Sequence, residues 1–270
     1  MEQRFLSPAQ AAAFVSESGL RVLSQPFAKT LVLSLLAGVY IGFGAQLSTV
    51  VTQDAQAHLG LGLSRFLGGS VFSLGLMLIV ICGAELFTGN SLLTKTALER
   101  KISWGAIARN WTLVILGNLA GSLFFAALMF YSDLWRTGNL EQQALAIAGA
   151  KVQIPFGAAL IRGILCNWLV CLAVFMAAAA RDIAGKILAC YVPIMAFVAS
   201  GFEHSVANMY FIPTGLFINE ATGSKLPHLD WAGFWHNLIP VTLGNVLGGV
   251  VFVGCAYWFV HLHGRKSTAN

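Results

Sequence analysis

The sequence has few charged residues. Only 10% of its 270 residues are Asp, Glu, Lys or Arg, and 57% are hydrophobic, whereas soluble domains carry about 25% charged residues. The mean hydropathy is +0.74. Because a soluble fold of this size could not bury so much hydrocarbon, we expect an integral membrane protein that lies in a lipid bilayer. The net charge of +5 does not indicate nucleic-acid binding, since the basic residues form no run or stripe.

Sequence motifs of enzymes are also missing. There is no phosphate-binding loop, dinucleotide fingerprint, nucleophile elbow or cluster of metal ligands. The 5 cysteines lie in apolar stretches without zinc-type spacing, and their odd number argues against a disulfide framework. We therefore expect no enzyme, no cofactor, no metal and no nucleotide-driven pump.

Six long apolar stretches follow one another along the chain. Since about 20 apolar residues are needed to cross a bilayer, we expect an all-α protein with six transmembrane helices. A segment from Pro8 to Ser24 mixes apolar and polar residues and predicts an amphipathic helix at the membrane interface, with no secretory signal. The six expected spans are residues 28–52, 64–94, 107–131, 156–180, 187–218 and 235–262.

Basic residues are unevenly divided between the two sides of these spans. When the first three residues of each span are counted with the adjoining loop, 11 of the 16 Lys and Arg fall on the side of both termini, 4 on the other side and one, Arg162, inside a span. The excess predicts that the N- and C-termini are cytoplasmic, as in a multi-pass protein of the cell (inner) membrane.

The two halves share a sequence pattern. A G-x-E-x-x-x-x-N motif occurs at Gly83–Asn90 and again at Gly201–Asn208, and a G-N-x-x-G motif at Gly117–Gly121 and again at Gly244–Gly248. A three-helix unit that is used twice must insert upside-down the second time. We therefore expect one transmembrane domain over residues 1–270, with an N-terminal segment 1–26, a first repeat 28–131 and an inverted second repeat 156–262.

The second and fifth spans carry polar or glycine-rich stretches at their middle and are expected to be broken helices. Irregular backbone at membrane depth is tolerated only where it lines a cavity or is buried in protein, and free helix ends suit an anion. His204 and Thr88 lie in these breaks, and an ionisable residue at this depth indicates function.

Two carboxylates and several amides also lie in or near the breaks. A bare carboxylate would repel an anion, so Glu85 and Glu203 are expected to accept hydrogen bonds from the loops and hold their shape. The amides expected to tie loop backbone together are Asn90, Asn208, Asn118 and Asn167, of which Asn167 could instead face the anion.

Four strings of sequence resemble the formate–nitrite transporter family, and bacterial formate channels in particular. They are Phe72–Leu76 with Cys82–Thr88, Leu165–Val174, Ala199–Met209 and Asn237–Asn245, and the similarity extends from about residue 8 to residue 263. The resemblance implies an aquaporin-like fold, a homopentamer and one pore in each protomer.

The resemblance also assigns roles to residues. It implies that Thr88 and His204 face each other at the pore centre with Asn167 nearby, and that Lys151 attracts anions in the outer vestibule. Spacing alone would favour core packing for four apolar residues that the family uses as constrictions. These are Phe72 and Phe202 for the outer constriction, and Leu76 and Phe87 for the inner one.

The function we expect is a bidirectional, pH-dependent channel for formate. Such an anion could take up a proton, directly or through a relay ending at His204, and cross as the neutral weak acid. Alternatively, it could cross as the anion while paired with protonated His204. The alternatives are nitrite or hydrosulfide on the same scaffold, with acetate as a further substrate, then a water or glycerol channel, then a membrane scaffold without transport. Arg162 could be a second vestibule charge, could snorkel to the interface or could pair with a carboxylate, and it weakens the preference for formate over nitrite.

Overall fold

The computed structural model describes residues 5–264. The N-terminal segment and C-terminus named above therefore extend in part beyond the described residues. The first half contains α1 Pro8–Leu23, α2 Phe27–Thr52, α3 Ala55–Phe72, α4 Leu74–Leu78, η1 Ile79–Gly83, η2 Gly89–Leu92, α5 Leu93–Leu98 and α6 Trp104–Tyr131. The second half contains η3 Leu134–Arg136, α7 Leu140–Val152, α8 Phe156–Ala179, α9 Ile183–Ala199, α10 Ser205–Thr222, α11 Trp231–Gly249, η4 Val250–Cys255 and α12 Ala256–His261.

The described chain is helical, and several of its helices are long and apolar. Five are long and apolar enough to cross a membrane: residues 27–52, 55–83, 104–131, 156–179 and 231–261. The stretch expected as a fifth span, residues 187–218, is divided between α9 of 17 residues and α10 of 18 residues. Large apolar side chains remain exposed along α6, α8, α9 and α11, which suits a surface covered by lipid or by other subunits.

Local signals explain where several helices begin. Ser7 and Gln10 form a capping box at the start of α1, which is the helix expected from Pro8 to Ser24. The carboxylates of Asp182 and Asp230 accept hydrogen bonds from Gly185 N and Gly233 N and so cap α9 and α11.

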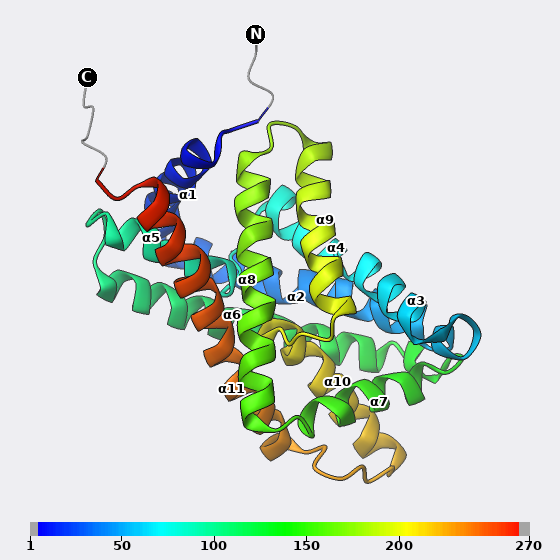
Figure 1. Cartoon of the computed structure of the whole chain (residues 1–270). Coiled ribbons are helices and arrows are strands. Elements are labelled where there is room, and N and C mark those ends of the chain that lie inside the picture. Colours follow the sequence, from blue (N-terminus) through cyan, green and yellow to red (C-terminus); the bar gives the residue numbers. More distant parts are fainter. Residues whose placement is uncertain (1–4, 265–270) are drawn as a thin grey trace.

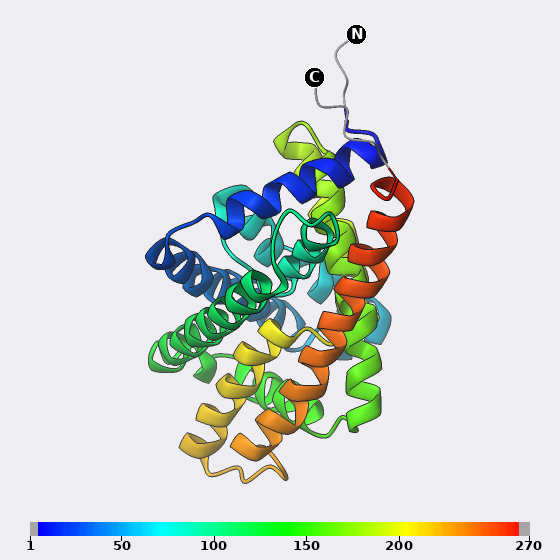
Figure 2. The same ribbon diagram turned by 90° about the vertical axis from the view of Figure 1, so that its left-hand side faces the viewer.

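The first and last helices lie at one end of the molecule. In Figures 1 and 2, α1 (blue) and α12 (red) lie beside the turn between α8 and α9. Ala11 and Ala12 of α1 share a buried cluster with Phe175 of α8 and with Leu262, which follows α12. The loop between α10 and α11 lies at the opposite end.

One helix, α7, and the first residues of another, α3, were not expected from the sequence. α7 joins the two halves and packs against α10, and α3 begins at Ala55, before a kink at Gly60 where φ is +76°. α7 has only 13 residues, too few to read as a span, so its sequence indicates only a connection between the two halves.

Glycines allow α2 to pack closely on α6, and α8 on α11. A Cβ at Gly121 would collide with the carbonyl oxygen of Leu35, and one at Gly248 would collide with the carbonyl oxygen of Ile164. The G-N-x-x-G motifs therefore lie at the contacts where the backbones of these helices approach each other.

This packing gives a first prediction. Gly248→Ala should destabilise the protein by about 1–3 kcal/mol, because the added methyl group overpacks the α8–α11 contact. Gly157→Ala, on α8 with no atom within 4 Å of the added Cβ, is the matched control and should be neutral or slightly stabilising. Thermal unfolding in detergent measures both, and equal melting temperatures would contradict the packing argument.

Candidate functional site

Two irregular loops interrupt the helices in the middle of the molecule. The first follows η1 and the second follows α9, and each begins at a glycine in the left-handed region: φ is +83° at Gly83 and +75° at Gly201. An L-residue with a side chain rarely adopts such a φ, so these glycines allow the chain to leave the helix. The breaks expected in the second and fifth spans lie at these two places, residues 84–88 and 200–204.

The two breaks meet through one hydrogen bond. Thr88 Oγ1 lies 2.9 Å from His204 Nε2, and both side chains are buried. His204 is also the N-cap of α10, where its Nδ1 accepts a hydrogen bond from Ala207 N at 3.2 Å. Because Nδ1 accepts, it carries no proton, so the neutral ring holds its proton on Nε2 and donates it to Thr88. The Thr88 hydroxyl hydrogen then remains free to point elsewhere.

One asparagine holds each break to the helix behind it. Asn118 Oδ1 accepts from Phe87 N at 2.9 Å, and its Nδ2 donates to Ser34 O and Glu85 O. Asn245 makes the corresponding bonds: its Oδ1 accepts from Ser205 N at 2.9 Å, and its Nδ2 donates to Gly163 O and Glu203 O. All these backbone groups are thereby satisfied without water.

The carboxylates of the two breaks are also bound alike. Glu85 accepts from Asn90 Nδ2 at 2.9 Å, and Asn90 also donates to Asn110. Glu203 accepts from Asn208 Nδ2 at 2.7 Å, and Asn208 also donates to Asn237. The carboxylates differ in their remaining partner. Glu85 accepts from Gln25, whereas Glu203 accepts from Lys151 at 2.9 and 3.0 Å.

Asn167 lies beside the first break. Its side chain is fully buried, and its Nδ2 is within hydrogen-bond distance of Thr88 O at 3.1 Å and Asn245 O at 2.6 Å. Of the two roles open to Asn167, these bonds match the one that ties loop backbone together, because they use its amide hydrogens.

A hollow with a volume of about 410 Å³ leads to His204 from the surface. Of the residues expected in the vestibule and outer constriction, Lys151, Phe72 and Phe202 line it. Leu76 and Phe87 are buried and do not line this hollow. Neither does Arg162, whose side chain is exposed on α8. Arg65, a residue that the sequence reasoning overlooked, does line it.

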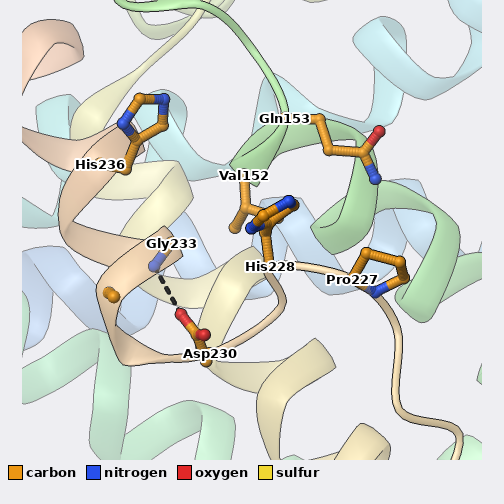
Figure 3. A pocket seen from close by; sticks show the side chains of 8 residues that line it. Val152, Gln153, Pro227, His228, Asp230, Gly233 and His236 are labelled. Atoms are coloured by element: carbon orange, nitrogen blue, oxygen red, sulfur yellow. Dashed lines mark hydrogen bonds between the residues drawn. The ribbon is translucent and has the colours of Figure 1, made fainter.

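A larger hollow lies elsewhere and does not reach the breaks. It has a volume of about 840 Å³ and is lined by residues 152–153 and by the segment before and at the start of α11. Figure 3 shows His228 and His236 at its wall and the capping bond from Gly233 to Asp230. Among the described residues, no group of three or more His, Cys, Asp or Glu is placed to hold a metal ion.

Comparisons with known proteins identify the family. Residues 9–259 match the family model described as Formate/nitrite transporter. The chain is 43% identical to the "Probable formate transporter" of Methanothermobacter thermautotrophicus, with 97% of this chain and 99% of the relative covered. It is 39% identical to the formate channel FocA of Escherichia coli (strain K12), with 95% of each chain covered.

Solved structures agree with these relatives. A structure described as "Pentameric formate channel with formate bound" has a TM-score of 0.77 and 39% identity, and covers 87% of this chain and 98% of its own. A structure described as "FNT family ion channel" has a TM-score of 0.82 and 35% identity, with coverages of 93% and 98%. These relatives are named as channels or transporters, and with its apolar helices the chain is a multi-pass membrane protein. The resemblance noted in the sequence is confirmed: the chain belongs to the formate/nitrite transporter family.

Proposed function

We propose that this protein is a channel for formate. The observation that carries the proposal is the hydrogen bond between Thr88 and His204, which joins the two breaks at the inner end of the 410 Å³ hollow. The names of the relatives and of the solved pentamer favour formate over nitrite, hydrosulfide or acetate.

The path runs from the hollow past two constrictions. Phe72 and Phe202 form the outer one, beside His204, and Leu76 and Phe87 form the inner one beyond Thr88. An unpaired anion meets a large desolvation cost between such apolar side chains. Thr88 and His204 are the polar groups between the constrictions, and they reduce this cost at the pore centre.

The chemistry at the centre follows from the tautomer of His204. The free hydroxyl hydrogen of Thr88 can donate to a carboxylate, and the Nε2 proton of His204 provides a second donor once it turns from Thr88 to the anion. The anion then leaves in the charged form or, after taking a proton from water, as the neutral acid. A relay through His204 needs a second ring proton on Nδ1, which would break the capping bond from Ala207 N. The neutral donor is therefore the resting state of the site.

The breaks keep their shape through their carboxylates and amides. In this proposal Glu85, Glu203, Asn90 and Asn208 hold the loops, and Asn167 supports the carbonyl of Thr88. Lys151 acts through Glu203. Arg162, which is exposed on α8, snorkels to the interface.

The fold we propose has six crossings in two inverted repeats, 28–131 and 156–262. Matched bonds support the repeat: Asn118 and Asn245 bind corresponding backbone groups, and Glu85 and Glu203 each bind an asparagine five residues later. The protein assembles as a homopentamer in the inner membrane with both termini in the cytoplasm. The basic residues on that side and the pentameric relative support this arrangement.

Uptake by proteoliposomes tests the function. Formate, nitrite and hydrosulfide are compared at pH 7 and pH 5, with empty liposomes as the control. We expect formate flux above that of both other anions. Preferential flux of nitrite or hydrosulfide would contradict formate as the substrate but would still support an anion channel. The absence of flux for all three anions would contradict the channel itself.

A further inference from the structure

Three residues that line the hollow carry a formal charge at neutral pH. They are Lys151 of α7, Glu203 of the second break and Arg65 of α3. The other polar side chains around them are neutral, among them Gln56, Gln143 and Ser64. The net charge that an approaching anion meets is therefore decided by how these three side chains are arranged.

The charge of Lys151 is balanced within the hollow. Its Nζ donates to both carboxylate oxygens of Glu203, at 2.9 and 3.0 Å, and lies 5.4 Å from the ring centre of Phe211. Only 15% of the Lys151 side chain and 6% of the Glu203 side chain is exposed. A paired, poorly exposed lysine and glutamate contribute no net charge to the hollow. Separating them would leave a buried ion without a partner, which is costly.

Arg65 is in the opposite situation. Its side chain is exposed and lines the hollow. Within residues 5–264 it has no ion pair and no hydrogen bond from its guanidinium group. An arginine keeps its charge, and its planar fork of donors matches the two oxygens of a carboxylate.

We propose that Arg65 recruits the anion at the mouth of the hollow, and that the Lys151–Glu203 pair is a neutral element that holds the second break. The ligand class is a small planar monovalent oxyanion, of which formate is the member that follows from the proposed function, and the proposal rests on that function. An unbalanced charge beside a low-dielectric wall raises the local concentration of the opposite charge, and salt screens this attraction.

The test measures initial uptake as a function of anion concentration at low and high ionic strength. Arg65→Gln should raise the half-saturating concentration about tenfold at low salt, leave the maximal rate near that of the unchanged protein and remove most of the salt dependence. Arg65→Lys should keep most of the salt dependence, because it keeps the charge. Lys151→Gln should instead lower the maximal rate, since it leaves the Glu203 carboxylate without its cation.

The matched control is Lys225→Gln. Lys225 is an exposed cation between α10 and α11 that does not line the hollow, so its loss should change neither parameter. Elution as the intact assembly in size-exclusion chromatography shows that each variant is folded.

The outcomes separate the two proposals. If the unchanged protein carries formate and Arg65→Gln has the same concentration and salt dependence, the role of Arg65 is wrong and the formate channel stands. If nitrite or hydrosulfide is carried instead, the same comparison with that anion tests Arg65, although the formate assignment has failed. If no anion is carried, both proposals fail.

Discussion

Replacing His204 by alanine should lower formate flux by about 10- to 100-fold. One donor to a charged ligand contributes about 1.5–3 kcal/mol, and alanine offers no donor opposite Thr88. The loss should appear in the maximal rate, because the bond between the two breaks lies at the inner end of the hollow, away from the mouth that first receives the anion.

A second effect of the same substitution must be separated from the first. His204 also caps α10 through Ala207 N, and loss of a cap costs about 1 kcal/mol of stability. Asparagine is a good N-cap and carries an amide donor, so His204→Asn is the matched variant. We expect it to unfold near the temperature of the unchanged protein and to keep part of the flux.

Uptake at pH 7 and pH 5 distinguishes a neutral hydrogen-bond donor at His204 from a proton relay through His204. If His204 acts as a neutral donor, His204→Asn should keep the pH dependence of the unchanged protein. The pH dependence of the flux then comes from protonation of formate and not of the histidine. A flux in His204→Asn that no longer responds to pH would indicate a proton relay through the histidine. Full flux in His204→Ala at both pH values would remove His204 from the mechanism.

The second large effect is expected at the two asparagines behind the breaks. Asn118→Ala and Asn245→Ala should each destabilise the protein by about 2–5 kcal/mol, because each leaves a buried backbone N–H and the loop carbonyl of Glu85 or Glu203 without this partner. Thermal unfolding in detergent measures the loss. The two variants should lose similar amounts, since they make corresponding bonds.

Asn139→Ala is the control for this pair. Asn139 is exposed at the start of α7, and its side chain makes no capping bond, so its replacement should shift the melting temperature little. A large effect at one asparagine and none at the other would contradict the equivalence of the halves. Little effect at both would mean that the breaks are held by other contacts.

Much of the architecture could be anticipated because lipid imposes strong rules on sequence. Long apolar runs predicted a protein of several apolar helices, and five helices long and apolar enough to cross a membrane lie among residues 5–264. The glycines at residues 83 and 201 lie where the helices are interrupted. α7 was missed because a short helix without a long apolar run resembles a connecting loop.

The charges of the hollow were harder to predict for a physical reason. Whether a cation attracts an anion depends on its neighbours in space, and the partner of Lys151 is Glu203, 52 residues away in the sequence. Arg65 lies within an apolar stretch, where its sequence context gave no sign that it would line a hollow.

The similarity of the two breaks has a consequence for how such a channel could evolve. Glu85 and Glu203 are 118 residues apart. At the same spacing, the residue in the first half that corresponds to His204 is Leu86, and the residue in the second half that corresponds to Thr88 is Val206. The positions that hold the backbone are thus the same in both halves, whereas the two residues that meet at the centre have no counterpart. A duplicated ancestor would have possessed the scaffold first, and selectivity would have arisen afterwards, through divergence at the few positions where the copies differ.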